Sequence, residues 1–317
     1  MELSLRTSVT ADVEEDGTVV VPGRLLVELA RLLPESPVTI AEQPEQNALS
    51  IVSGSAQYEL RTYSAEDFPR IPESQSALLH RLEAGPLLET IERVSRASSR
   101  DESRPVLTGI YALLGDGKLV MAATDSYRLA VKETALGGEV PDFEAIIPAR
   151  ALEEVRRIAA GADVVELGVL ENQVVFGVGG TWLTTRRIDG QFPKYKELLP
   201  TSFEHEVAIA RDELLDVVRR TAVMAQRNAP LRLRFAEGEL TVSAQAQELG
   251  EARETLPVAF AGEPLEIGFN AEFLRDGVES VTGDELVLKL INPLRPGLIQ
   301  GTGDDFWYLI MPIRLVG

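Results

Sequence analysis

Apolar and polar positions follow two spacings along the chain, and the order of these spacings repeats. The stretch Val20-Val21-Pro22-Gly23-Arg24 runs from a short apolar strand through a proline into residues whose apolar positions have helical spacing. The stretch Ile146-Ile147-Pro148-Ala149-Arg150 does the same, with Pro148 lying 126 residues after Pro22. Because proline is favoured in the first turn of a helix, each stretch predicts a strand followed directly by an amphipathic helix.

Two further pairs of similar segments extend this repeat. Asp67-Phe68-Pro69-Arg70 and Gln191-Phe192-Pro193-Lys194 stand 124 residues apart, measured between their phenylalanines. A fainter third copy has a helix opening at Phe269, which lies 121 residues after Pro148, and then the apolar strand 286–291. Three copies at a nearly constant spacing predict a chain built from repeated units.

The second and third copies each have an earlier half. In the second copy, residues 87–94 carry apolar side chains on one helical face, and residues 107–123 form a hairpin around Gly115-Asp116-Gly117. In the third copy, residues 213–220 and 231–242 repeat that helix and hairpin. A complete unit is therefore helix, strands, helix, strands, which predicts a pseudo-symmetric α+β domain of about 120 residues.

The first copy lacks this earlier half. At the repeat spacing Met1 falls opposite Tyr127, so nothing in the chain corresponds to residues 76–126 of the second copy. We expect a partial domain over residues 1–73 and complete domains over 74–201 and 202–317. The partial domain has lost part of the cover of its apolar side chains, so we expect it to be the least stable region of the chain.

Composition and charge narrow the possible functions. The 317 residues are 44% apolar and 26% charged, which is an ordinary globular balance. Fifty acidic residues against 31 Lys and Arg give a net charge of −19, which disfavours nucleic-acid and anionic-membrane partners unless arginines gather locally. The absence of cysteine excludes disulfides and thiolate chemistry, and two histidines, His80 and His205, leave little for histidine chemistry.

Targeting signals are not visible in the sequence. Residues 1–6 lack the basic and apolar regions of a signal peptide, and no run of 18 apolar residues exists. We therefore expect a cytoplasmic protein, associated with the nucleoid if it binds DNA, and no membrane partner.

Catalytic motifs are weak. Gly177-Val178-Gly179-Gly180 lies between two apolar strands and predicts a hairpin turn rather than a dinucleotide loop. Glu14-Glu15-Asp16 and Asp304-Asp305 lie in polar stretches without further metal ligands. Asp125 is the best single acid, although a carboxylate that caps a turn is the more ordinary interpretation. We expect no catalytic residue, no metal and no cofactor.

Three segments, taken together, point to one family. Ala123-Thr124-Asp125-Ser126-Tyr127-Arg128-Leu129-Ala130 resembles the Ala-Thr-Asp-x-x-Arg-Leu segment of bacterial DNA polymerase III β subunits, the sliding clamps. Asp189-Gly190-Gln191-Phe192-Pro193-Lys194-Tyr195 resembles their Asp-Gly-x-Phe-Pro-x-Tyr segment. Tyr308-Leu309-Ile310-Met311-Pro312-Ile313-Arg314-Leu315 resembles their C-terminal Met-Pro-Met-Arg-Leu ending. With the repeat, the resemblance covers essentially the whole chain.

The chain also departs from the family pattern. Ser126 and Tyr127 replace the commoner Gly-His pair, Ile313 replaces a Met, and Val316 and Gly317 extend the ending. The largest departure is the missing first half of domain 1. Residues 1–6 resemble the strand that follows a Thr-Asp-Leu element in the family, which suggests a late start or a truncated chain.

The resemblance implies a fold and a function. It implies repeated DNA-clamp domains, with two helices of each domain lining a hole and antiparallel sheets outside. A head-to-tail homodimer would encircle double-stranded DNA without reading its sequence and would tether the replicative polymerase, giving processivity. The partners would be the DNA polymerase III α subunit, the clamp loader, other polymerases and repair proteins. Such a subunit has no catalysis of its own, including 3′-5′ exonuclease activity, and polymerase or nucleotidyltransferase labels apply only by association.

The resemblance also implies three groups of site residues. A cleft for apolar partner peptides would be formed by Leu107, Thr124, Tyr127, Arg128, Leu129, Pro193, Leu198, Leu309, Ile310, Met311, Pro312, Ile313 and Arg314. Residues facing DNA would be Arg24, Arg93, Arg96, Arg100, Arg104, Arg150, Arg219 and Arg220, of which Arg93, Arg96 and Arg100 form one stripe if their helix continues that far. The dimer interface would contain Tyr58 and Leu60 on one side and Val223 and Met224 on the other.

Other interpretations stay open at this point. The cleft residues could be ordinary core strands, and the arginines could be solvated helix faces paired with Glu89, Glu92, Glu153 and Glu154. The chain could be a clamp fragment that binds partner peptides without closing a ring. It could also be an unrelated enzyme on a repeated α+β scaffold, which an acid–base pair in a deep pocket would favour.

Overall fold

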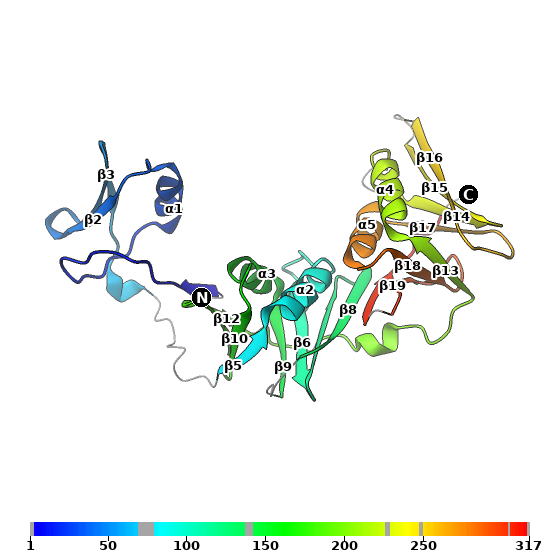
Figure 1. Cartoon of the computed structure of the whole chain (residues 1–317), viewed down its shortest axis with the longest axis horizontal. Helices are drawn as coiled ribbons and strands as arrows, with labels where there is room; N and C mark the ends of the chain where they lie inside the picture. Colours follow the sequence, from blue (N-terminus) through cyan, green and yellow to red (C-terminus); the bar gives the residue numbers. More distant parts are fainter. Residues whose placement is uncertain are drawn as a thin grey trace. The chain divides into compact units, whose positions relative to one another are not determined.

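Two units of the chain fold separately in the computed structural model (Figure 1). The structure describes residues 3–68, 79–136, 142–225, 229–246, 250–303 and 305–315. Residues 8–73 form the first unit, and residues 2–7 join residues 74–317 in the second. The expected boundary at residue 73 lies outside the described residues, as do Pro69, Arg70, Asp304, Val316 and Gly317 of the sequence motifs.

The first unit consists of one helix on a small sheet. Its elements are α1 (Gly23–Leu32) and an antiparallel sheet in the order β2 (Val38–Gln43), β3 (Ala48–Ser53), β4 (Ala56–Arg61). Leu49, Ile51 and Leu60 are buried, and side chains of α1 pack against them.

Helix α1 is poorly covered. None of its residues is buried, and the side chains of Leu25 and Leu32 are 49% and 79% exposed. The helix at the same place in the next repeat, α3 (Ala149–Ile158), buries Leu152 and Val155 completely. The apolar side chains of α1 are therefore less covered than those of α3 in the part of the chain that the structure describes.

The second unit holds two complete repeats. The earlier repeat consists of β5 (Leu79–Glu83), α2 (Ala84–Ser95), β6 (Gly109–Gly115), β7 (Lys118–Thr124), β8 (Arg128–Ala135), β9 (Phe143–Pro148), α3, β10 (Val164–Val169), β11 (Gln173–Val178) and β12 (Thr181–Arg186). The later repeat has the same order: β13 (His205–Ala210), α4 (Arg211–Ala222), β14 (Leu231–Ala236), β15 (Glu239–Ala246), β16 (Gly250–Pro257), β17 (Leu265–Phe269), α5 (Ala271–Ser280), β18 (Glu285–Leu290), β19 (Gly297–Gly301) and β20 (Phe306–Ile310).

Strand pairing fuses the two repeats. An eight-stranded sheet in the order β13-β18-β19-β20-β8-β7-β6-β9 takes four strands from each repeat and joins them at β8 and β20, where Arg128 pairs with Ile310. The strand β1 (Leu3–Arg6) joins the five-stranded sheet β1-β12-β11-β10-β5 in the same way, with Leu3 opposite Thr185. β1 therefore pairs with β12, the last strand of the earlier repeat, in the same way as β8 pairs with β20, the last strand of the later repeat.

Local signals in the sequence account for most elements. Asp116 and Gly117 have φ of 50° and 71° between β6 and β7, and Gly179 and Gly180 have φ of 54° and 85° between β11 and β12, as primed hairpin turns require. Pro22 and Pro148 stand at the N-caps of α1 and α3, so the chain runs through each proline directly into a helix as predicted. One expectation was wrong in detail. Phe269 ends β17, and α5 starts after Asn270, whose side chain accepts a hydrogen bond from the Phe273 amide at 3.0 Å.

The helices of the second unit lie together on one face. Helices α3 and α2 contact each other, as do α2 and α5, and α5 and α4, while the sheets lie on the other side (Figure 1). In the part of the chain that the structure describes, no helix combines the length and apolar character needed to cross a membrane. The apolar faces of these helices and the sheets share one large core.

The difference between α1 and α3 predicts a difference in local stability. Amide hydrogens in Val19–Leu33 should exchange faster with solvent than those in Ile146–Ile158, because few buried contacts oppose local opening of the first unit. Leu152→Ala should speed exchange across α3, since it removes a completely buried side chain, whereas Leu25→Ala, at an exposed position of α1, should change exchange in α1 little. Equal protection of the two segments in the parent protein would contradict this account.

Candidate functional site

A tight turn between β7 and β8 presents an exposed aromatic side chain. The Asp125 Oδ1 atom accepts hydrogen bonds from the backbone N–H groups of Tyr127, at 2.9 Å, and Arg128, at 3.0 Å. Ser126 takes a φ of 81°, and its N–H donates to the Thr124 hydroxyl at 3.1 Å. Asp125 therefore caps a turn, as its ordinary interpretation predicts. The Tyr127 side chain is 61% exposed.

The C-terminal segment lies beside this turn. The Met311 N–H donates to the Tyr127 carbonyl at 2.8 Å, and the Ile313 N–H donates to the Gly268 carbonyl at the same distance. A Cβ atom at Gly268 would come within 2.6 Å of the Leu315 side chain, so the close approach of the segment requires glycine there. Met311 is 43% exposed. Because its N–H bonds to Tyr127, the two residues lie next to each other at the surface.

Residues 192–203 cover the adjoining sheet. Phe192, Leu199 and Phe203 pack with the buried Tyr195 on a cluster that includes Leu129 and Leu309. Leu198 is exposed within this segment, and Pro193 is half-buried.

The predicted cleft residues divide by burial. Exposed members are Tyr127, Leu198, Met311 and Arg314, and half-buried members are Leu107, Pro193, Pro312 and Ile313. Buried members are Thr124, Arg128, Leu129, Leu309 and Ile310. The buried five correct the sequence interpretation: they are core residues under the surface and cannot themselves present it to a partner.

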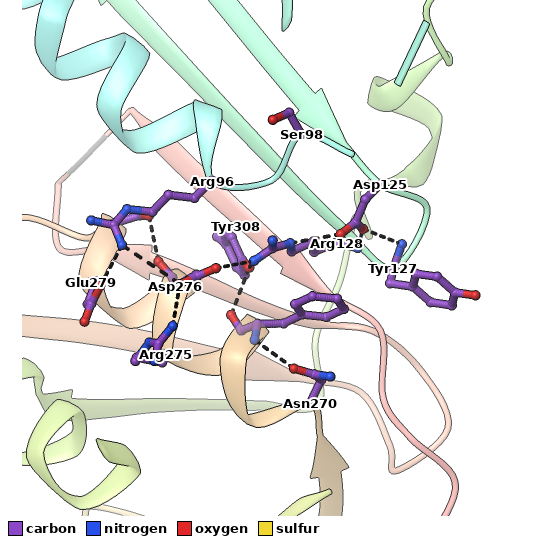
Figure 2. Close-up of polar contacts among 12 residues, drawn as sticks. Arg96, Ser98, Asp125, Tyr127, Arg128, Asn270, Arg275, Asp276, Glu279 and Tyr308 are labelled. Atoms are coloured by element: carbon purple, nitrogen blue, oxygen red, sulfur yellow. Dashed lines mark hydrogen bonds and ion pairs between the residues drawn. The ribbon is translucent and has the colours of Figure 1, made fainter. Parts of the chain in front are cut away.

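Arg128 is the most connected of these buried residues (Figure 2). Its Nε donates to Asp125 Oδ2 at 3.1 Å, and its Nη1 donates to Asp276 Oδ2 at 2.5 Å and to the Tyr308 hydroxyl at 3.3 Å. Burial alone lowers the pKa of Arg128, but Tyr308, Asp276 and Asp125 outweigh it and raise the pKa above its ordinary value. The guanidinium is therefore always charged, although its side chain is only 8% exposed.

Sequence reasoning missed the later repeat's part in this site. Asp276, Phe273 and Tyr308 all contact Arg128, the ring of Phe273 lying 4.2 Å from its guanidinium carbon. Asp276 lies 148 residues from Arg128 in the chain. The only local signal was an acidic residue on the apolar side of a helix, where a carboxylate needs a partner.

Arg93 does not face DNA, which corrects its assignment. Its side chain is 4% exposed, its Nε donates to the Ser280 carbonyl at 2.6 Å, and its guanidinium carbon lies 4.3 Å from the centre of the Phe306 ring. Helix α2 also ends at Ser95, so Arg100 lies beyond it and the three arginines do not form one helical stripe. Arg93 instead joins α2 to the later repeat.

The other seven predicted arginines reach solvent: Arg24, Arg96, Arg100, Arg104, Arg150, Arg219 and Arg220. Most have acidic neighbours. Arg96 and Arg219 share Glu279, at 2.6 Å and 2.8 Å, and Arg220 binds Glu254 at 2.7 Å.

Arg24 and Arg104 also lie in exposed ion pairs with nearby carboxylates. Arg24 lies 3.0 Å from Glu28. Arg104 bonds to Asp101 at 2.8 Å and also to the Ser126 hydroxyl at 3.1 Å, which brings it beside the Tyr127 turn.

The dimer residues also divide by burial. Val223 is exposed after α4, whereas Leu60 is buried within its own unit, which leaves it no surface to offer a partner. Tyr58 and Met224 are half-buried. The strands beside them, β4 and β16, each lie at the edge of a sheet in the described structure.

A hollow on the earlier repeat adjoins the covering segment, and Phe192, Pro193 and Tyr195 are among its lining residues. It has a volume of about 770 Å³ and is lined by residues that include Tyr111, Glu144 and Arg187. Burial, followed by the charge of Glu144, raises the pKa of Tyr111 to about 12, so its hydroxyl stays protonated near neutral pH. Among the described residues, no three His, Asp or Glu side chains are grouped to hold a metal ion.

Three family models match successive parts of the chain. They describe the N-terminal, central and C-terminal domains of the DNA polymerase III β subunit and match residues 1–72, 81–194 and 196–314. The chain belongs to the DNA polymerase III β subunit family. Curated relatives bear the name β sliding clamp. One from Synechococcus elongatus is 35% identical over 325 residues, which are 99% of this chain and 86% of the relative. One from Streptomyces coelicolor is 33% identical over 330 residues, which are 100% and 87%.

Solved sliding clamps share the fold. A clamp from Pseudomonas aeruginosa has a TM-score of 0.87 at 28% identity, covering 99% of this chain and 87% of that structure. A β sliding clamp from Caulobacter crescentus has a TM-score of 0.89 at 28% identity, covering 99% and 86%. The resemblance drawn from the motifs is confirmed, and so is the α+β class with repeated clamp domains.

Burial of Arg93 predicts a cost in stability. Arg93→Ala should lower the free energy of unfolding by about 2 kcal/mol, because it leaves the Ser280 carbonyl without its partner and removes the contact with Phe306. The matched exposed residue is Arg150, where substitution by Ala should change stability by less than about 0.5 kcal/mol. Urea denaturation of both variants checks this, and equally small effects would show that Arg93 is not a structural link.

Proposed function

We propose that this chain works as a sliding clamp of DNA replication. Two copies form a ring around duplex DNA and hold the replicative polymerase on it without catalysing a reaction themselves. The observation that carries the proposal is the match of β subunit models along the whole chain. The Tyr127–Met311 surface and the arginine-bearing helices give that function two separate sites.

The helix face of the second unit is the proposed DNA side. A duplex is bound there through its phosphates, which need local positive charge and no base contacts. Arg150 and Arg100 are exposed. Arg219 and Arg220 lie in surface ion pairs, which are weak enough for a phosphate to compete with the carboxylate. The net charge of −19 is then carried mainly by the rest of the surface.

The proposed docking surface for partners consists of Tyr127, Leu198, Met311 and Arg314. Three of these are exposed apolar or aromatic side chains, which suit a short apolar peptide, and a flexible Met accepts several sequences. The DNA polymerase III α subunit, the clamp loader, other polymerases and repair proteins are the proposed partners. Work on chromosomal DNA implies a cytoplasmic, nucleoid-associated protein.

Ring closure is proposed at two sheet edges. An edge strand presents unpaired backbone groups that can pair with another chain. Strand β4 lies at the edge of the first unit, and β16 lies at the edge of the later repeat, where the Met224 side chain comes within 3.5 Å of a Cβ position at Gly250. Pairing of β4 with β16 of a second copy, with Tyr58 facing Val223 and Met224, gives a head-to-tail dimer.

The docking surface predicts a loss of peptide affinity. The double variant Tyr127→Ala/Met311→Ala should bind an apolar peptide from the replicative polymerase at least about thirtyfold more weakly, since truncated anchor residues typically cost 2 kcal/mol or more. Leu294→Ala, an exposed apolar residue elsewhere in the later repeat, is the control and should bind normally. Fluorescence anisotropy measures both. Undiminished affinity of the double variant would place the partner site elsewhere.

The proposed dimer interface predicts that acidic substitutions at Val223 and Met224 will prevent dimer formation. Val223→Glu/Met224→Glu should convert a concentration-dependent dimer into a monomer, because like charges would enter an apolar contact. Sedimentation velocity over a range of concentrations checks this. Identical behaviour of variant and parent would refute the interface.

Topology gives a second measurement on the same pair of proteins. The parent, assembled with nicked circular plasmid, should co-elute with the plasmid at high salt and be lost when the plasmid is cut, since a closed ring can leave only over an end. The variant should not be retained. Loss of the parent from uncut plasmid under these conditions would contradict an encircling ring.

A further inference from the structure

A buried chain of charges runs from the Tyr127 turn to helix α5 (Figure 2). Asp125 lies at one end of Arg128 and Asp276 at the other, with N–O distances of 3.1 Å and 2.5 Å. Asp125 and Arg128 belong to the earlier repeat, and Asp276 belongs to the later one. The three side chains are between 8% and 13% exposed, so water screens their interactions little.

The buried carboxylate of Asp276 needs a positively charged partner. This carboxylate lies on the buried side of α5, where a charge without a partner is costly. Two other arginines lie near its Oδ1 atom, Arg275 at 3.6 Å and Arg96 at 3.9 Å, and both are more exposed than Arg128. Only Arg128 makes a short hydrogen bond to it among the described residues, so Arg128 is its main counter-charge.

Arg128 in turn is fixed in orientation. Its guanidinium carbon lies 4.2 Å from the centre of the Phe273 ring, and the Tyr308 hydroxyl, which it contacts, donates to the Phe273 carbonyl at 2.8 Å. The guanidinium is planar, and Asp276 binds its Nη1 atom while the Phe273 ring lies against it. These two contacts fix the direction in which the Nε–H bond points. That N–H group donates to Asp125.

Asp125 connects the fixed Arg128 side chain to the exposed turn. Its second carboxylate oxygen holds the N–H groups of Tyr127 and Arg128, and the Tyr127 carbonyl accepts the Met311 N–H. Two exposed residues of the docking surface, Tyr127 and Met311, are thus attached to the same turn.

We propose that Asp276 and Arg128 are positioning residues for the partner-peptide surface. The charge of Asp276 in the later repeat orients Arg128, which holds Asp125 and with it the turn that places Tyr127 and Met311. The surface is therefore correctly shaped only when the two repeats are docked against each other. This inference rests on the proposed function of that surface.

The test compares Asp276→Asn with Arg275→Ala in the full chain. The first change keeps the shape of the side chain and removes its charge, and the second removes a neighbouring ion pair without touching Arg128. Peptide affinity is measured by anisotropy with an apolar polymerase peptide, at a temperature where near-ultraviolet circular dichroism shows each variant to be folded. Asp276→Asn should bind about tenfold more weakly, and Arg275→Ala should bind like the parent.

Amide exchange provides a readout that a purely structural role would not move. In Asp276→Asn the amides of Tyr127, Arg128 and Met311 should exchange faster, while those of β6 and β7 keep their protection. If Asp276→Asn does not fold, Arg128→Lys serves instead, because lysine keeps the positive charge but lacks the fork that reaches both carboxylates. It should show the same two effects.

The outcomes separate this inference from the proposed function. Normal affinity and normal exchange in folded Asp276→Asn, together with weak binding by Tyr127→Ala, would overturn the positioning role and leave the docking surface in place. Normal binding by Tyr127→Ala would remove the docking surface itself and the inference with it.

Discussion

The ion pair between Arg128 and Asp276 lies where the two complete repeats meet, and it joins a buried side chain of each repeat. Strands β8 and β20 continue one sheet across the junction, while the ion pair joins the start of β8 to helix α5 above the sheet. Arg93 makes a second link of the same kind, from α2 to Ser280 and the Phe306 ring. Loss of Asp276 removes one of the two carboxylate partners of the buried Arg128 guanidinium, and the loss of a buried partner costs far more than the loss of an exposed one.

Burial gives the arginines two different roles. Arg93 and Arg128 are buried and connect the repeats, whereas Arg150, Arg219 and Arg220 are exposed on the helices and remain available to phosphates. On the proposed DNA side, the exposed arginines lie on helices and their carboxylate partners bind them weakly at the surface, which is how an acidic chain would present a DNA-binding face. The proposed partner surface instead uses the exposed apolar and aromatic side chains of Tyr127, Leu198 and Met311.

The sequence predicted the fold well because its signals are local or periodic. Helical spacing located α1 to α5 within a few residues, and the repeat spacing predicted the shared order of elements in the two complete repeats. The site was predicted only in outline, because the residue type of Arg93 or Leu129 does not reveal whether it is buried. The pairing of Asp276 with Arg128 could not be found from the sequence, since the two residues lie 148 positions apart and only the fold brings them together.

A double-mutant cycle on Arg128 and Asp276 tests this junction. Peptide affinity and free energy of unfolding are measured for the parent, Arg128→Lys, Asp276→Asn and the double variant. If one ion pair carries both effects, the losses are not additive, and the coupling energy is about 1 kcal/mol or more in each quantity. Additive losses in peptide affinity would contradict the account, because the two residues would then act on the docking surface independently.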